Sequence, residues 1–245
     1  MASTSGLFRC RRSSLATILA NAMPLAISVS VLVSVSIAVA MATRSSEAQA
    51  QPANHPSLNA QLLVAARQGD AAQTTRLLRS GAAINSRNRL GKSALLLACE
   101  KGNAGLASLL MAAGADPNQA SLEGVTPLMA ASYAGNAALV RQLLDVGART
   151  DPTDRMRKPA AVYAAGQGHA AALEVLLAGG VDVNAVYEHD LTLLMWAAGQ
   201  GHAQAVRLLL ERGARSEMRD DRGMTAIEIA RQSGHGEAAE SAGLH

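Results

Sequence analysis

Apolar residues recur at helical spacing through most of the chain, and the recurrence itself has a fixed period. Val140, Leu143 and Leu144 lie at positions i, i+3 and i+4, which is the apolar stripe of an amphipathic helix. The same stripe returns at intervals of 33 residues, at Leu173, Leu176 and Leu177 and at Val206, Leu209 and Leu210. The pattern therefore predicts one kind of helix, repeated along the chain.

Glycines mark the ends of the predicted helices with the same period. Because a helix commonly ends at a left-handed residue, most often Gly, a glycine series indicates a series of helix ends. Two such series run at intervals of 33 residues: Gly69, Gly102, Gly135, Gly168, Gly201 and Gly234, and then Gly81, Gly114, Gly147, Gly180 and Gly213. Gly makes up only 21 of 245 residues, so two series in phase are not a coincidence. From residue 58 onward the chain is a repeat array.

The start of each unit is predicted by a capping residue. The hydroxyl of Thr126 can accept a free backbone N–H at the beginning of a helix, and Pro127 lies where a missing donor costs nothing. Ser93, Thr192 and Thr225 occupy the same position in other units. Each unit is therefore predicted to be a helix, a tight turn, a second helix and an extended loop.

The segment Thr126-Pro127-Leu128 and the 33-residue period resemble the ankyrin repeat. Further segments that are similar to the family lie at residues 114–118, 181–184, 197–202 and 220–225. The resemblance implies an all-α ankyrin-repeat solenoid of stacked helix-turn-helix-loop units in residues 58–245. The six repeats are expected at about 58–87, 88–120, 121–153, 154–186, 187–219 and 220–245.

The chain departs from the family pattern in two ways. The histidine of the family motif, which helps to tie the loop to the helices, is replaced in every copy, by Leu63, Leu96, Met129, Val162, Met195 and Glu228. We therefore expect the hydrogen bonding of the loops to differ from that of the family. Repeat four departs furthest, because Pro159 replaces the capping Thr and Arg157 replaces a loop Gly. We expect it to be the weak junction of the array.

Residues 1–50 have the order of a secretory signal. Arg9, Arg11 and Arg12 precede a largely apolar stretch, and small residues lead to Ala48-Gln49-Ala50. Cleavage after Ala50 would leave residues 51–57 as a short flexible leader. The alternative is a signal anchor within residues 15–42, because residues 25–41 approach the length of a membrane span. Both interpretations predict repeats outside the cytoplasm, either periplasmic or secreted, or anchored to the membrane.

Removal of the predicted signal would change the net charge of the chain. The chain has 22 Lys and Arg and 19 Asp and Glu, and residues 1–50 contain four of the former and one of the latter. Residues 51–245 therefore hold 18 of each and are formally neutral. The basic balance belongs to the signal, and the array gives no global electrostatic case for binding nucleic acid.

The candidate chemistry is sparse, and we expect no enzyme activity, no cofactor and no metal site. Gly91-Lys92-Ser93 resembles part of a phosphate-binding loop, but Ser86 stands where the first glycine of that motif is needed. His169, His202 and His235 share one phase of the repeat, and stacked helices lie about 8–10 Å apart, too far for three such histidines to bind one zinc ion. Cys99 takes a helix position held by small residues elsewhere and is interpreted as a buried thiol.

With no catalytic, cofactor or metal site expected, the sequence favours a surface that binds another protein. The resemblance implies that a protein partner contacts the loop tips and the exposed, concave face of the first helices. We predict the contact residues to be Arg89, Leu90, Lys92, Leu122, Val125, Tyr133, Arg155, Met156, Lys158, His189 and Arg222. Tyr163 and Trp196 lie at one phase of adjacent first helices, where packing between repeats is favoured over ligand contact.

These residues favour a non-enzymatic, monomeric interaction module that is exported and binds a protein with an acidic patch. Membrane association is expected only if the signal is not cleaved. A secreted effector that acts on the proteins of another cell is an alternative, and retention in the periplasm would distinguish the two. An enzyme with an unrecognised site is the third alternative, which a strongly perturbed acid or His in a closed pocket would support.

Overall fold

The array is built from helix pairs. A computed structural model describes residues 56–245, and the predicted signal, anchor and cleavage site lie outside the described residues. The first helices of the six pairs are α2 (Leu58–Gln68), α4 (Ala94–Glu100), α6 (Pro127–Tyr133), α8 (Ala160–Gly166), α10 (Leu193–Gly199) and α12 (Ala226–Gln232). The second helices are α3 (Ala71–Arg79), α5 (Ala104–Ala112), α7 (Ala137–Asp145), α9 (Ala170–Ala178), α11 (Ala203–Glu211) and α13 (Gly236–Ser241). The all-α solenoid predicted from the repeat pattern is confirmed.

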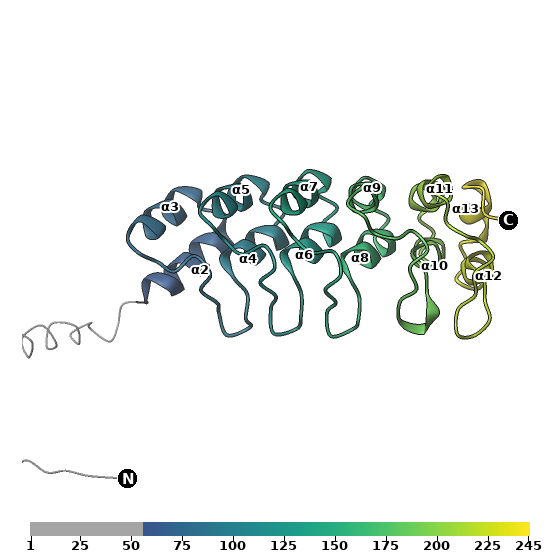
Figure 1. The fold of residues 1–245 in the computed structure, drawn as a ribbon, viewed down its shortest axis with the longest axis horizontal. Helices are drawn as coiled ribbons and strands as arrows, with labels where there is room; N and C mark the ends of the chain where they lie inside the picture. Colours follow the sequence, from purple (N-terminus) through teal and green to yellow (C-terminus); the bar gives the residue numbers. More distant parts are fainter. Residues whose placement is uncertain (1–55) are drawn as a thin grey trace, which may run out of the picture. The chain divides into compact units, whose positions relative to one another are not determined.

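The helices form two rows, and the loops form a third (Figure 1). First helices line one row, second helices line the other, and the loops between pairs extend beyond the first helices. One short 3₁₀ turn, η1 (Glu188–Asp190), forms the tip of the loop before α10. This arrangement places the loop ends and the first helices on the same side of the array.

The capping residues start the first helices as predicted. The side-chain oxygens of Ser93, Thr126 and Thr192 accept the backbone N–H of the residue three positions later, at 3.2–3.3 Å. Pro159 occupies the equivalent position before α8 and provides no such hydrogen bond. Repeat four therefore begins without the cap that stabilises its neighbours.

The core consists of thin layers of Ala and Leu. Leu62, Leu106, Leu143 and Leu209 are fully buried, and they come from four different helix pairs. At the C-terminal end, α13 presents few apolar residues, but Leu244, which follows it, is also fully buried. Each helix pair thus buries its apolar side against the next pair, and Leu244 helps to close the last one.

Asparagine side chains connect the loops that follow successive second helices. The Oδ1 atom of Asn118 accepts the N–H of Arg149 at 2.8 Å, and Asn184 makes the equivalent bond to Arg215 at 2.8 Å. Asp151 stands at this position between repeats three and four and instead pairs with the side chain of Arg149. The bond to the next loop is therefore missing at that junction.

Among residues 56–245, no helix has the length and apolar character required to span a bilayer. The anchor predicted within residues 15–42 falls outside this part of the chain, so it stays a prediction.

Candidate protein-binding face

Each loop turns at a two-residue tip, and in repeats two, three, four and six a polar side chain near the base of the loop holds this tip. The Oδ1 atom of Asp154 accepts the backbone N–H groups of Met156 at 2.9 Å and Lys158 at 2.8 Å. The side-chain oxygens of Asn88, Ser121 and Asp220 accept the equivalent pairs in repeats two, three and six. These side chains hold the loops in a chain that lacks the family's histidine, and their recurrence at one phase of the repeat could have been noticed in the sequence.

Successive tips are joined through the backbone. The N–H of Leu122 donates to the carbonyl of Leu90 at 3.0 Å, and the N–H of Arg155 donates to Glu123 at 2.9 Å. Gly91 permits this approach, because a Cβ on Gly91 would lie only 2.7 Å from the backbone nitrogen of Leu122. The tips of repeats two, three and four therefore form one ordered row.

The row is interrupted between repeats four and five. The N–H of Glu188 has no acceptor among residues 56–245, although the N–H of Asp221 again donates to His189 at 3.1 Å. Arg157, in repeat four, replaces the loop glycine and takes a left-handed φ of 55°. Tyr187 replaces the polar residue at the base of the loop in repeat five. A groove of about 350 Å³ separates the two tips, with Met156 and Trp196 among its lining residues.

Several predicted contact residues are exposed apolar side chains. Leu90, Leu122 and Met156 are 59, 61 and 60% exposed, and each lies at the tip of a different repeat. Tyr133, on α6, is also exposed, whereas Val125 is half-buried and packs against the core. Large side chains of this kind are more often buried, so a regular row of them indicates an interaction surface.

The predicted basic residues divide into free and paired groups. Arg89 and Arg155 are exposed, and within residues 56–245 their side chains make no hydrogen bond or ion pair. Lys92 is half-buried and pairs with Glu100 at 2.7 Å. The other predicted charged residues contact neighbours: Lys158 with Trp196, His189 with Asp221, and Arg222 with Asp220. Arg89 and Arg155 are therefore the cations of this surface that are free to meet a partner.

Three aromatic side chains follow one another along the first helices. The rings of Tyr133 and Tyr163 pack edge to face, with centroids 5.9 Å apart, and the ammonium group of Lys158 lies 4.6 Å from the ring centre of Trp196. The hydroxyl of Tyr163 donates to Asp154. Burial and this hydrogen bond to the carboxylate raise the pKa of Tyr163 above its usual range. Tyr163 and Trp196 thus contact neighbouring residues, and both also line shallow grooves.

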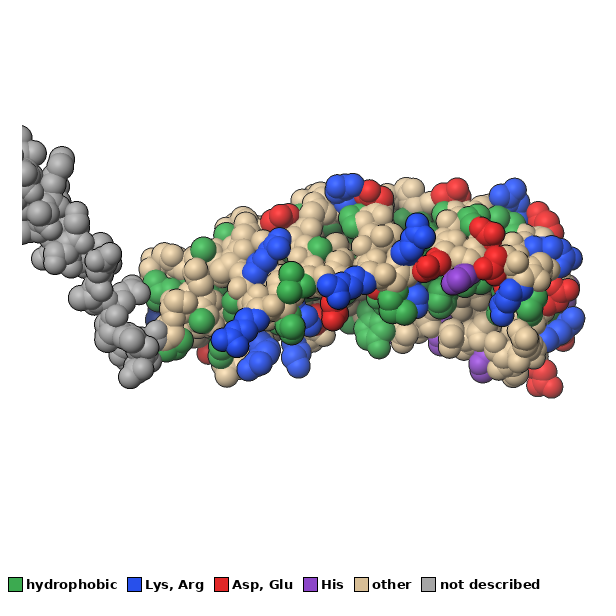
Figure 2. Space-filling view, turned by 90° about the horizontal axis from the view of Figure 1, so that it is seen from below, with side chains coloured by type: hydrophobic (Ala, Val, Ile, Leu, Met, Phe, Trp, Pro, Cys, Tyr) green, Lys and Arg blue, Asp and Glu red, His purple; other side chains and the backbone are tan. Residues whose placement is uncertain are grey.

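We define the tip face as the predicted contact residues together with Tyr163 and Trp196. Seen from the side of the loops, basic and apolar side chains lie beside one another over the repeats nearer the N-terminus, and acidic side chains are denser toward the C-terminal end (Figure 2). Acidic residues also lie at three of the tips, namely Glu123, Glu188 and Asp221 in repeats three, five and six. Within residues 56–245, Arg89 and Arg155 are the unpaired basic residues at the tips of repeats two and four.

The phased histidines connect repeats. The Nε2 atom of His169 lies 2.9 Å from the carbonyl oxygen of Tyr133, and Nε2 of His202 lies 3.0 Å from that of Gly166. In residues 56–245 no group of three or more His, Cys, Asp or Glu side chains is arranged to hold a metal ion. These two histidines have a structural partner one repeat earlier.

Cys99 lies inside α4 and is fully buried. Burial raises the pKa of its thiol to about 12, and the charge of Glu100 acts in the same direction. A thiol that stays protonated is a poor nucleophile, so the position is interpreted as part of the packing.

Comparison with known proteins agrees with the geometry. A family model described as ankyrin repeats (3 copies) matches residues 62–156 and 161–241. The match is interrupted at residues 157–160, where Arg157 and Pro159 depart from the motif. The crystal structure of EF0377, an ankyrin repeat protein, is similar with a TM-score of 0.68 and 26% identity, over 74% of this chain and 96% of that chain. No curated protein matches. With the family model matching most of its length, the chain belongs to the ankyrin repeat family.

Proposed function

We propose that the chain is a non-enzymatic module that binds a protein partner through the tip face. Ankyrin repeats generally act as scaffolds for protein–protein interaction. The observation that carries the proposal here is the row of exposed Leu90, Leu122 and Met156 at three successive tips. Their backbone is already fixed by tip-to-tip hydrogen bonds, so binding would cost little conformational entropy in the loops.

The partner presents an acidic patch beside an apolar one. Arg89 and Arg155 flank the apolar tips without acidic partners of their own. Exposed charges of this kind contribute mainly to the rate of encounter and to the choice of partner, whereas the apolar tips contribute more of the binding energy. The chain works as a monomer in this proposal, because one array supplies the whole row.

The export proposal rests on the sequence of residues 1–50. A basic start, an apolar stretch and Ala48-Gln49-Ala50 favour translocation and cleavage, which would leave the array in the periplasm or outside the cell. Fractionation of native cells separates a resident periplasmic module from a secreted effector. Mass spectrometry of the native protein decides between cleavage after Ala50 and retention of an anchor.

Charge reversal tests the face. We expect Arg89→Glu with Arg155→Glu to weaken capture of the native partner from its own compartment by at least tenfold, since the variant repels the acidic patch. The control reverses two arginines on the second helices, Arg141→Glu with Arg207→Glu, and should bind normally. Thermal stability should be nearly unchanged in both, because exposed charges contribute little to folding. Normal binding by the tip variant and loss of binding by the control would refute the proposal.

A further inference from the structure

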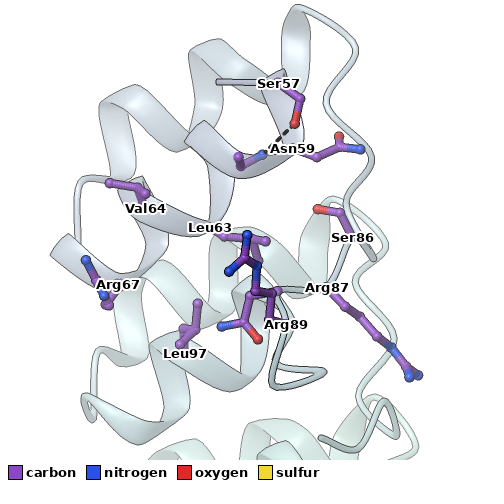
Figure 3. Close-up of a pocket in the computed structure, with 11 residues that line it drawn as sticks. Ser57, Asn59, Leu63, Val64, Arg67, Ser86, Arg87, Arg89 and Leu97 are labelled. Atoms are coloured by element: carbon purple, nitrogen blue, oxygen red, sulfur yellow. Dashed lines mark hydrogen bonds between the residues drawn. The ribbon is translucent and has the colours of Figure 1, made fainter. Parts of the chain in front are cut away.

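Among residues 56–245, no loop precedes the first helix pair, whereas a loop precedes each of the other five pairs. Loops precede α4, α6, α8, α10 and α12, whereas only Pro56 and Ser57 precede α2 in the described part of the chain. A groove of about 680 Å³ lies beside the tip of repeat two, between α2 and residues 86–89 (Figure 3). It occupies the place where the periodicity would put the tip of repeat one.

The walls of this groove are apolar on the side of α2. Leu63 and Leu97 lie at its base, and each is under a tenth exposed. Val64, on the same helix as Leu63, is 45% exposed. A side chain placed here would remove Val64 from water and complete the cover over both leucines, which favours an apolar occupant.

The rim of the groove is basic. Arg67 comes from α2 and Arg89 from the second loop, while Arg87 extends outward from the loop (Figure 3). No acidic side chain is among the lining residues, and none of these three arginines forms an ion pair within residues 56–245. Carboxylates are the groups that complete such an arginine cluster, because a guanidinium can bind them with two parallel hydrogen bonds.

The backbone at the groove also has an unused donor. Leu122 and Arg155 each donate their N–H to the preceding tip, and Arg89 is the residue at the same phase in repeat two. Within residues 56–245 no tip precedes it, and the N–H of Arg89 has no acceptor there. The row of tips therefore ends in a free donor that an extended chain can use, as a strand adds to the edge of a sheet.

We infer that an extended, acidic segment of a partner protein binds in this groove and takes the place of the missing tip. Its backbone carbonyl accepts the N–H of Arg89, an apolar side chain covers Val64, and carboxylates on either side pair with Arg67 and Arg89. This inference rests on the proposed function and assigns the N-terminal end of the tip face to a linear motif.

The groove favours a protein segment over the other anionic occupants. Single-stranded nucleic acid is usually bound without sequence preference by a basic groove with aromatic side chains on which the bases stack, and the lining of this groove contains no aromatic residue. The chain's own residues 1–55 include a single acid, Glu47, so they are a poor match for three arginines.

A random library of twelve-residue peptides displayed on phage tests the inference on the purified full chain. We expect selection to enrich peptides in which Asp or Glu flanks a Leu, Ile, Phe or Met. A synthetic peptide from the enriched set should shift the backbone amide signals of Val64 and Arg89 in the NMR spectrum. Enrichment of peptides without acids, or shifts confined to the second helices, would overturn the inference.

A matched pair of variants locates the binding. Arg67→Glu should weaken binding of the selected peptide at least tenfold, whereas Arg79→Glu should leave it unchanged. Arg79 is a suitable control, because it is also an exposed arginine in the last turn of a helix, on α3 away from the groove. Equal binding by the two variants would overturn the inference, even with peptides of the expected composition.

Two further outcomes would assign the groove to another occupant. Binding of single-stranded DNA as tightly as the peptide, and with the same loss in Arg67→Glu, would show a general anion site. Protection of the Arg89 amide in the free full chain, with no response to peptide, would show that the chain's own N-terminal segment fills the groove. If any of these results overturns the inference about the groove while partner capture still depends on Arg155, the proposed function stands without that inference.

Discussion

The imidazole of His169 packs over Gly135, the glycine that ends the first helix of the preceding repeat. A Cβ on Gly135 would lie 2.5 Å from the ring, and the Nε2 atom of His169 lies 2.9 Å from the carbonyl oxygen of Tyr133. His202 covers Gly168 in the same way. The glycine is therefore required twice, once for its positive φ and once for the space that the next histidine occupies.

The double requirement makes Gly135→Ala more destabilising than an ordinary left-handed Gly→Ala change. Gly147 is the control, because its φ is 88° and nothing lies within 4 Å of a Cβ added there. We expect Gly147→Ala to cost about 1–2 kcal/mol for the backbone alone. Gly135→Ala should cost a further 1–3 kcal/mol or so for overpacking. Urea denaturation measures both, and equal losses would show that the histidine yields freely.

Repeat four should open before its neighbours. Pro159 gives α8 no side-chain cap, Asp151 breaks the asparagine connection to repeat three, and the tip bond to repeat five is absent. In a stacked array the least stable repeat exchanges first. Hydrogen exchange should be fastest at residues 153–166 among repeats two to five. Uniform protection across these repeats would contradict the expectation.

Restoring the Thr-Pro cap before α8 should stabilise repeat four. Pro159→Thr with Ala160→Pro rebuilds the arrangement of Thr126 and Pro127 and should slow exchange at residues 153–166. The cap should contribute about 0.5–2 kcal/mol. Both replaced residues are buried on the core side of the loop, so partner binding should be unaffected. No gain in stability would show that the missing cap is compensated within repeat four.

The left-handed conformation of Arg157 is a second source of strain in this repeat. Its φ is 55°, whereas Gly91 and Gly124 hold the equivalent loop position in repeats two and three. Arg157→Gly should stabilise the array by up to about 1 kcal/mol, because glycine removes the cost of the left-handed region. Arg155→Gly, which lies outside that region, should give no gain. Equal melting temperatures for the two variants would contradict this account.

Cys99 should make stability fall in alkaline solution. Its pKa is about 12 in the folded chain and about 8.5 when unfolded, so the unfolded chain alone loses this proton as pH rises between those values. The sign is therefore a loss of stability with rising pH, by at most about 1.4 kcal/mol per unit. Cys99→Ala should show a shallower decline than the natural chain, because the half-buried Tyr163 and Tyr187 are present in both proteins and contribute equally. Identical slopes would mean that the thiol is accessible in the fold.

The periodic residues made the fold predictable. The phase of the glycines, the capping residues Ser93, Thr126 and Thr192, and the apolar stripe of α7 each have a local physical reason that survives in the structure. Leu244 was missed as a closing residue because it lies after the last helix and no leucine stands at its phase in the earlier repeats.

The candidate binding face was predictable only in part. The sequence locates the tips, so Leu90, Leu122 and Met156 could be predicted at exposed positions from their phase alone. It does not say which charges are free, because the pairing of Lys92 with Glu100 and the packing of Lys158 on Trp196 depend on the path of each loop. Arg67 was missed for a related reason, since it lines a groove beside the tip of repeat two where no earlier tip stands among residues 56–245.

Photo-crosslinking in the native compartment tests the central claim most directly. A photoreactive amino acid replaces Leu122 or Met156 on the tip face, or Arg141 on α7 as the control. The account predicts that both tip positions crosslink to the same protein and that the α7 position does not. Crosslinking from Arg141 alone, with neither tip position reacting, would contradict the assignment of the binding face to the tips.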